Sequence, residues 1–490
     1  MGERKETELI RTIVADGRQE FDALSGLAGR DGAPGTEVEQ AVRRIIDDVR
    51  AEGDAAVTRY AREFDGQAAA PGGRIGTLSR EDLKAAFESL DTALADALLH
   101  AAENIRAYHK AQADSLKGYE EKYIATGAQK GYEEKYIASG AQKGYEEKYT
   151  ATGAPGSSDD EQVVIGQTVR GLAKVGVYVP GGTAAYPSTV LMNIIPAKLA
   201  GVGEIVMVTP PRPGALGGAS GAGENAFATD AAILGAAYIA GADRVILAGG
   251  GQAVAALAYG TETIPRVDKI VGPGNIYVAT AKRLLYGVVD IDMIAGPSEI
   301  LIIADESANA AFAAADLLSQ AEHDPLAASI LLTTDPKVAA EAAIHLAEQM
   351  NLLERREIIR ASIENNGLII ICRSEDEMIR LANEIAPEHL EILTKDPFAV
   401  LARIQNAGSV FLGPWTPEPV GDYYSGTNHV LPTNGTARFA SPLGVYDFVK
   451  RMSYTRYTEA ALNTAKNDIL ELSEAEGLTA HARAVKIRFD

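Results

Sequence analysis

Four histidines of this chain lie beside acidic or amide side chains, in positions where ligands are commonly bound. The first lies in the stretch DLLSQAEHDP, where Pro325 is expected to end an Ala-rich helix. Gln320 and His323 are three residues apart, so we expect them on one helix face. An amide oxygen and an imidazole on one face make half of a metal site. A histidine that only interacts with the dipole of a helix C-terminus is the competing interpretation.

The second histidine follows a glutamate in IAPEHLEIL. Pro387 is expected in the first turn of a helix, which would put Glu388 and His389 at a loop–helix junction. From a junction both side chains can reach one cleft. An imidazole has the pKa range for taking a proton from an alcohol, and a neighbouring carboxylate could activate water. Capping of the helix by Glu388, with a solvated His389, remains the alternative.

The third and fourth histidines lie towards the C-terminus. Asp422 and His429 belong to GDYYSGTNHVLPT, which we expect to be a ligand-binding loop or an ordinary loop with Asx-turns. Glu476 and His481 belong to EAEGLTAH, where a solvated tail is the alternative. A site with nitrogen and oxygen ligands and no thiolate suits Zn²⁺, with Mn²⁺ or Co²⁺ possible. The candidate ligand set is Gln320, His323, Asp422 and His481, and spacing alone does not bring these four together.

The single cysteine, Cys372, excludes an intrachain disulfide and a thiolate zinc site. It ends the apolar run GLIIIC, so we expect a packed strand residue. A cysteine nucleophile for aldehyde oxidation is the alternative. The other histidines, at positions 100, 109 and 345, lie in expected helices and have packing roles.

The elements that must position these residues follow from the hydrophobic pattern. Residues 36–66 predict a helix, a glycine break and a second helix, with apolar positions 42, 45, 46 and 49 on one face. Residues 80–111 are also helical. From residue 163, short β-branched runs alternate with Ala-rich segments, and a second such series starts at EILIIAD. This alternation predicts an α/β protein with two doubly wound, Rossmann-like domains, a helical N-terminal segment and a C-terminal helical or arm extension.

A unit of 13 residues, KGYEEKYIATGAQ, occurs three times in residues 117–154. Short strands with turns or a mobile surface loop both fit it, and it offers no histidine, aspartate or cysteine. Residues 211–224 predict a second, Gly-rich loop, and the tail NTAKNDILELSEAEGLTAHARAVKIR predicts a helix followed by a charged strand or arm. The expected division is 1–116 (N-terminal helices and start of the first α/β domain), 117–162 (repeats and linker), 163–297 (second α/β domain), 298–443 (continuation of the first) and 444–490 (C-terminal helix and arm).

Composition excludes several classes of function. The net charge is −21 without a Lys/Arg block, so nucleic acid is an unfavourable partner. No apolar run reaches the ~18 residues of a transmembrane helix, and the N-terminus lacks the apolar core of a signal peptide. Together with the lone cysteine, this predicts a cytoplasmic protein without membrane partners.

Eight stretches in order resemble those of histidinol dehydrogenases: VGVYVPGGTAAYPSTVLMNIIPAKLAGV, GGGQAVAALAYGTETIPRVDKIVGPGN, IDMIAGPSEILIIAD, LLSQAEHDP, APEHLEI, NAGSVFLG, GDYYSGTNHVLPT and EGLTAHARAVKIR. The match runs from about residue 36 to the C-terminus, without the repeats and the 211–224 loop. The resemblance implies oxidation of L-histidinol through the aldehyde to L-histidine with two NAD⁺, the last stage of histidine biosynthesis. It also implies a homodimer with a shared active site, which leaves open whether His481 acts in its own chain or in the other.

The resemblance also implies a role for each candidate residue. Zinc, one per subunit, would be held by the four candidate ligands, and Glu388 and His389 would be the acid–base pair. Tyr178, Gln252 and Asn275 would contact NAD; because no G-x-G-x-x-G follows a strand, this assignment rests on the resemblance alone. The substrate would contact Ser298, Gln320, His323, His389, Asp422, His429, Glu476 and His481.

Three other functions are considered. They are oxidation of another small alcohol with the same machinery, zinc-dependent hydrolysis, and a non-enzymatic scaffold built on the repeats. The chain lacks an H-E-x-x-H helix, which makes hydrolysis less attractive.

Overall fold

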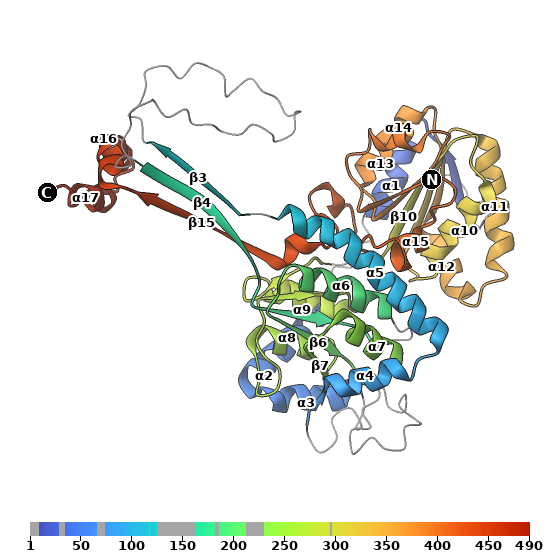
Figure 1. The fold of residues 1–490 in the computed structure, drawn as a ribbon. Coiled ribbons are helices and arrows are strands. Elements are labelled where there is room, and N and C mark those ends of the chain that lie inside the picture. The colour runs from blue at the N-terminus through green and yellow to red at the C-terminus, as the bar shows by residue number, and fades with distance from the viewer. Residues whose placement is uncertain are drawn as a thin grey trace. The chain divides into compact units, whose positions relative to one another are not determined.

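The computed structural model describes residues 9–28, 35–65, 74–116, 118–124, 162–181, 186–211, 230–294 and 296–490. Two compact units divide the chain: Met1–Ser115 with Gly171–Val449, and Leu116–Arg170 with Lys450–Asp490. The first unit contains two six-stranded sheets (Figure 1). Apart from residue 211, the predicted Gly-rich loop lies outside the described residues, as do the repeats beyond residue 124.

The first sheet is parallel throughout, with strand order β1-β12-β11-β10-β13-β14. Its inner strands are mainly apolar and buried, because helices cover both faces. The strands are β1 (Arg11–Val14), β10 (Glu299–Ala304), β11 (Ala328–Thr333), β12 (Gly367–Ile371), β13 (His389–Leu393) and β14 (Ser409–Leu412).

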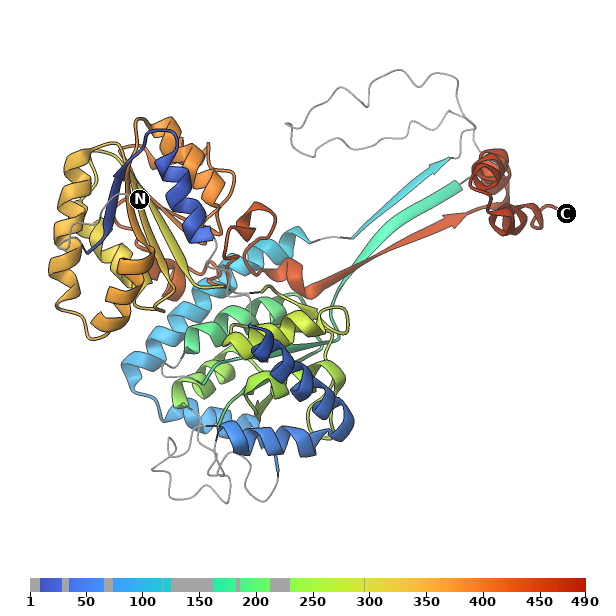
Figure 2. The ribbon, with the colours of Figure 1, turned by 180° about the vertical axis from the view of Figure 1, so that it is seen from behind.

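Alternate residues of these strands enter opposite cores, as the period of a strand requires. Ile300 and Ile302 pack under the helices of one face, and Leu301 and Ile303 under those of the other. Figures 1 and 2 show α10, α11 and α12 on one side of the sheet and α1 and α13 on the other. The helices are α1 (Gln19–Ala28), α10 (Ala310–Ala321), α11 (Pro336–Met350), α12 (Arg356–Asn366), α13 (Glu375–Ile385), α14 (Pro397–Leu401) and α15 (Glu418–Tyr423).

The second sheet has strand order β2-β7-β6-β5-β8-β9, and only the edge strand β2 is antiparallel to its neighbour. Its strands are β2 (Gly76–Leu78), β5 (Lys174–Tyr178), β6 (Glu204–Thr209), β7 (Arg244–Leu247), β8 (Lys269–Val271) and β9 (Asp290–Ile291). One face packs on α4 (Arg80–Glu88), α5 (Thr92–Ser115), α6 (Pro187–Leu199) and α7 (Ala231–Ala240). The other packs on α2 (Thr36–Glu52), α3 (Asp54–Phe64), α8 (Gly250–Tyr259) and α9 (Ile276–Leu285).

The fold class predicted from the alternating pattern is confirmed: the protein is α/β, with two mostly parallel sheets. The helix–glycine–helix prediction is also confirmed, since Gly53 separates α2 from α3. The apolar face predicted for the first of these helices is buried in full, at Val42, Ile45, Ile46 and Val49.

The second unit contains a three-stranded sheet of β15 (Val449–Tyr457), β4 (Gln162–Gly171) and β3 (Tyr119–Ile124), with β3 antiparallel to β4. The strand β3 is the YEEKYI of the first repeat copy, so that copy forms a strand. Two short 3₁₀ helices, η4 (Thr436–Arg438) and η5 (Val445–Phe448), precede β15 in the chain and belong to the first unit.

For the end of the tail, the strand alternative of the prediction is wrong, whereas the arm alternative stays a prediction. The helix α16 (Glu459–Ala475) is followed by a second helix, α17 (Thr479–Lys486), instead of a strand. Gly477, at a φ of 73°, provides the turn between them. The sequence TAHARAVK consists mainly of good helix formers, and Arg483 and Lys486 lie in its last turn, where cations favour the dipole. None of the described helices is both long and apolar enough to span a membrane.

Candidate active site

A cavity of about 720 Å³ lies in the first unit, between the edges of its two sheets. On the first sheet, the cavity residues Ser298 and Glu388 immediately precede β10 and β13, so they lie at the amino ends of parallel strands. On the second sheet, Gly272 and Asp292 immediately follow β8 and β9, at carboxyl ends. Open α/β sheets usually bind ligands at carboxyl ends, so the second sheet has the ordinary geometry for a nucleotide. The cavity brings together eight predicted site residues: Asn275, Ser298, Gln320, His323, Glu388, His389, Asp422 and His429.

His389 is the first residue of β13, and Glu388 precedes that strand. The helix predicted to begin at Pro387 is therefore wrong. The run HLEIL pairs in parallel with β10 on one side and β14 on the other, and it is buried throughout. Pairing on both sides outweighs the weak signal that a proline gives for a helix start.

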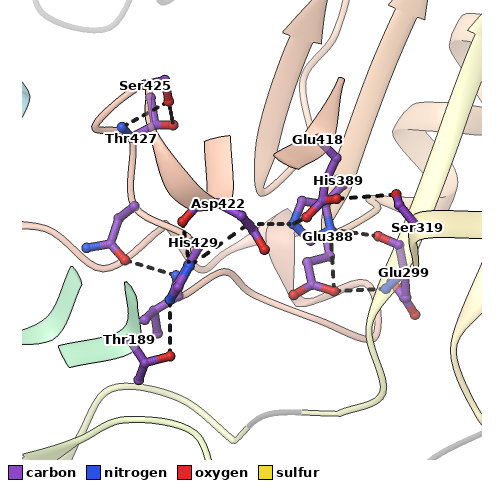
Figure 3. A network of polar contacts seen from close by, with 12 residues as sticks. Thr189, Glu299, Ser319, Glu388, His389, Glu418, Asp422, Ser425, Thr427 and His429 are labelled. Atoms are coloured by element: carbon purple, nitrogen blue, oxygen red, sulfur yellow. Dashed lines mark hydrogen bonds and ion pairs between the residues drawn. The ribbon is translucent and has the colours of Figure 1, made fainter. Parts of the chain in front are cut away.

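The main chain of Glu299 holds both members of the predicted acid–base pair (Figure 3). Its N–H donates to Glu388 Oε2 at 2.8 Å, and its carbonyl accepts from His389 Nδ1 at 3.1 Å. Because a carbonyl can only accept, the imidazole proton is on Nδ1 and the lone pair is on Nε2. Nε2 is buried without a hydrogen-bond partner among the described residues. The arrangement presents an unprotonated base to the cavity.

Burial sets the charge of this pair. It lowers the pKa of His389 to about 3, since a charged imidazole would lose its hydration. Burial also raises the pKa of Glu388 well above its ordinary value, helped by the acidic groups of Glu299 and Asp422. A neutral histidine and a carboxyl group that readily holds a proton suit general acid–base chemistry.

The residues that could hold a metal ion lie next to His389. Ligand atoms of His323, Glu418 and Asp422 all lie within 4.8 Å of one another. His389 Nε2 is 3.9 Å from Glu418 Oε1 and 4.0 Å from Asp422 Oδ1. Three oxygen and nitrogen donors at this separation suit Zn²⁺ or a similar divalent ion.

Gln320 provides the test of whether a cation fits this cluster. Its side chain is 1% exposed, lines the cavity, and has neither amide atom hydrogen-bonded within the described part of the chain. A buried amide without a partner is costly, and a cation at its oxygen would remove the part of that cost that falls on the oxygen. Gln320 is in the last turn of α10, whereas His323 lies in the turn after the helix ends at Ala321. The predicted shared helix face is thus wrong for His323, although both residues reach the same cavity.

Glu418 was missed from the sequence. It and Asp422 are four residues apart on α15, and a carboxylate oxygen of each lies within 4.8 Å of the other. Burial raises the pKa of Glu418 to about 8 and that of Asp422 to about 6. The loop predicted around Asp422 is instead this short helix, and the spacing of four was the signal that could have found Glu418.

His429 lies in the segment after α15 and connects the two sides of the cavity. Its Nε2 is 3.3 Å from Thr189 Oγ1 on α6, and its Nδ1 is 3.2 Å from the Asp422 carbonyl (Figure 3). Burial lowers its pKa to about 4, so the ring is neutral. Through these two contacts His429 joins Thr189 on α6 to the main chain of Asp422 on α15.

A buried ion pair also missed from the sequence supports the second sheet's side of the cavity. Lys282 and Asp292 form an ion pair, and both side chains are almost fully buried. Lys282 donates to the Gly272 carbonyl at 2.9 Å, and Asp292 Oδ2 accepts from the Gly272 N–H at 2.8 Å. A Cβ at Gly272, whose φ is 108°, would lie 2.1 Å from the Tyr178 carbonyl oxygen. The loop Gly272–Asn275 is therefore held tightly from both sides.

The residues that the resemblance assigns to NAD are less close together. Asn275 lines the cavity, but its side-chain oxygen caps α9 by accepting from the N–H groups of Tyr277 and Val278. The Tyr178 hydroxyl accepts from the Gly250 N–H at 3.0 Å, at the start of α8. Gln252, on the same helix, is 1% exposed. Tyr178 and Gln252 are not among the residues that line the cavity.

The remaining predicted site residues belong elsewhere. Glu476 and His481 lie in the second unit, where both are exposed at the end of α16 and on α17. Cys372 follows β12 directly and is packed in the core, 4% exposed. Burial raises its pKa to about 12, so it is a thiol at neutral pH. This agrees with the predicted packing role.

The fold and the cavity define a class of protein: an α/β enzyme with a buried neutral histidine, an adjacent carboxyl group and a cluster that can hold a cation. The family model for histidinol dehydrogenase matches residues 29–489. Histidinol dehydrogenase from Bacillus anthracis is 48% identical over 452 residues, 92% of each chain. The one from Clostridium acetobutylicum is 45% identical over 485 residues, 98% of this chain and 99% of its own.

A solved structure gives the same result. The crystal structure of histidinol dehydrogenase from Elizabethkingia anophelis matches with a TM-score of 0.81 and 33% identity, and the match covers 99% of both chains. The chain therefore belongs to the histidinol dehydrogenase family, and it is an oxidoreductase of histidine biosynthesis.

Proposed function

We propose that the enzyme oxidises L-histidinol through L-histidinal to L-histidine, with Zn²⁺ as the metal and two NAD⁺ reduced in turn. The observation that carries this proposal is the geometry at His389. An unprotonated Nε2 lies within about 4 Å of a cluster that can hold a cation, in one cavity. A substrate with an alcohol, an amine and an imidazole could use both features at once.

Zinc would be held by Gln320, His323, Asp422 and His481. When bound, it supplies a cationic anchor for the imidazole and amine of the substrate. The first three of these residues line the cavity. Glu418 is the further oxygen donor on the same side. Ser298, His429 and Glu476 would complete the contacts to histidinol.

His389 would act first, by accepting the proton of the substrate alcohol at Nε2 while hydride leaves the carbinol carbon. The hydrogen bond from Nδ1 to Glu299 keeps the ring in the orientation and tautomer that this step needs. Tyr178, Gln252 and Asn275, which all belong to the second sheet and its helices, would bind NAD, the hydride acceptor. Of these three, Asn275 lines the cavity.

The aldehyde must then be hydrated, because hydride can leave only from a tetrahedral carbon. Glu388, as the carboxylate, would take a proton from the attacking water, while His389 would return the proton of the first step to the aldehyde oxygen. The geminal diol forms and His389 is left neutral again. His389 would accept a proton from this diol during the second hydride transfer. Neither step requires Cys372, which is packed in the core.

The proposal assigns a role to each of the predicted domains. Residues 163–297 would form the NAD side, 298–443 would carry the zinc and acid–base residues, and 444–490 would form the arm of a homodimer. The lone cysteine supports a cytoplasmic location for such an enzyme.

Production of NADH that depends on histidinol, with and without a chelator, tests the proposal. We expect NADH formation with histidinol, loss of activity with the chelator, and recovery on adding zinc. Activity that survives complete removal of metal would reject the zinc site. Activity on another amino alcohol but not on histidinol would reject the substrate.

A further inference from the structure

The helix α15 carries two acidic residues of the candidate metal cluster, and its own start needs an external partner. It is only six residues long, and prolines occupy positions 417 and 419. Pro419 has no N–H, and the Val420 N–H bonds to the Pro417 carbonyl at 2.9 Å. The Glu418 N–H is thus the donor for which the helix itself provides no acceptor.

Glu391 provides that acceptor. Its Oε1 accepts from the Glu418 N–H at 2.8 Å, and its side chain is 1% exposed. Glu391 lies two residues after His389 on β13, so both side chains extend from one face of the strand. The hydrogen bond therefore ties the strand that carries the proposed base to the helix that carries Asp422.

A second carboxyl group completes the connection. The carboxyl group of Asp316, on α10, lies next to that of Glu391, and Glu391 Oε2 has no hydrogen-bond partner among the described residues. Asp316 is four residues before Gln320, so the two share a face of α10. The charges that act on the Glu391 carboxyl group are those of Asp316 and Glu418, which are acidic.

Packing alone would not select these residue types. Burying two carboxyl groups destabilises the fold relative to apolar side chains of the same size, unless polar interactions compensate for their lost hydration. Here each of the two residues is connected to a helix that carries a residue of the cluster. Asp316 is on α10 with Gln320, and Glu391 is hydrogen-bonded to the start of α15, which carries Glu418 and Asp422. Outer residues that orient ligands in this manner usually govern how tightly a metal is held.

We propose that Glu391, supported by Asp316, is a positioning residue that caps α15 and so places Glu418 and Asp422 for the metal. The proposal rests on the proposed zinc-dependent function. It assigns no contact with substrate to Glu391. Its role is to fix three elements relative to one another before a cation arrives.

The test compares Glu391→Gln, Glu391→Leu and Glu391→Asp in the full-length enzyme. Glutamine keeps an acceptor for the Glu418 N–H and a donor for Asp316, leucine keeps only the size, and aspartate keeps the charge but is one methylene shorter. Zinc affinity should fall roughly 10- to 100-fold for Glu391→Leu and Glu391→Asp, and stay within about threefold of wild type for Glu391→Gln. The zinc concentration for half-maximal NADH formation should shift in parallel, and excess zinc should restore activity.

The outcomes separate this inference from the proposed function. A wild-type enzyme that binds no zinc rejects the function, whatever the variants do. A wild-type enzyme that needs zinc, together with Glu391→Leu and Glu391→Asp variants of unchanged zinc affinity, overturns the positioning role. Loss of affinity in Glu391→Gln equal to that in Glu391→Asp overturns it as well. If Glu391→Leu does not fold, the comparison of Glu391→Asp with Glu391→Gln decides.

Discussion

The Glu299 carbonyl and His389 Nδ1 are 3.1 Å apart, and this hydrogen bond decides which nitrogen of the imidazole can act as a base. Glu299 opens β10 and His389 opens the neighbouring strand β13, and the register pairs Ile300 with His389. Parallel pairing thus places a main-chain acceptor beside Nδ1 whatever the side chain at position 299. The lone pair of Nε2 is left facing Glu418 and Asp422.

Replacing His389 by alanine should abolish turnover and leave zinc in place. The imidazole is the proposed acceptor of the substrate proton and lies outside the proposed ligand set, so we expect kcat to fall roughly 10²- to 10⁴-fold. Metal content and NADH production measured on the same sample check this. His345→Ala, which removes a partly exposed histidine of α11, is the matched control. A His389→Ala enzyme that has lost its zinc would show that His389 is a ligand.

Cys372→Ala should retain full activity, because the thiol is buried away from the cavity and burial raises its pKa to about 12. A raised pKa means that the protonated thiol persists at neutral pH, so iodoacetamide at pH 8 should modify the native enzyme slowly and the denatured chain quickly. Mass spectrometry of the alkylated chain gives the rate. Loss of activity in a folded Cys372→Ala enzyme would instead favour a cysteine nucleophile over hydration of the aldehyde.

Zinc affinity should rise with pH between about 6 and about 8. Burial raises the pKa of Asp422 to about 6 and that of Glu418 to about 8, so below these values a cation must displace protons. Each displaced proton changes the affinity by up to about tenfold per pH unit. Zinc titration calorimetry in two buffers of different ionisation enthalpy measures the protons released. Glu418→Gln should lose the part of this dependence near pH 8, whereas equal affinity of the wild type at pH 6 and pH 8 would exclude a role for these protons.

Lys282→Met should destabilise the protein by about 3–5 kcal/mol, because it leaves Asp292 buried without its cation. It should also raise KM for NAD with unchanged zinc content, since Lys282 holds the loop at Gly272. Denaturant unfolding and steady-state kinetics measure the two effects. Lys198→Met breaks a partly exposed pair with Asp243 and should cost only about 0–1 kcal/mol. Equal costs for the two variants would mean that the Lys282 pair is not a buried constraint.

The hydrophobic pattern of the sequence was sufficient to predict the two-sheet architecture, but it did not predict the secondary structure around the candidate site residues. Alternation of apolar runs predicted two α/β sheets, because strands covered on both faces are mainly apolar. It could not place β13, since Pro387 and the acidic residue after it also fit a helix start. The deciding interactions come from β10 and β14, which lie far away in sequence.

The burial and contacts of the acidic residues around the cluster could not be predicted from the sequence either. Glu418 lies between two prolines and resembles a surface residue in the sequence, yet it is 2% exposed. Glu391 interrupts an apolar strand, and only the tertiary structure shows that it reaches the Glu418 N–H. Gln320 and His323 could be predicted because they are close in sequence, although α10 ends between them.

The number of NADH molecules formed per histidinol consumed tests the central claim most directly. In the proposed mechanism one base, His389, serves both hydride transfers in a single cavity, so complete conversion of a limiting amount of L-histidinol should give two NADH and L-histidine. A yield of one NADH with accumulated aldehyde would contradict the account, because it would show that the site catalyses the first oxidation alone.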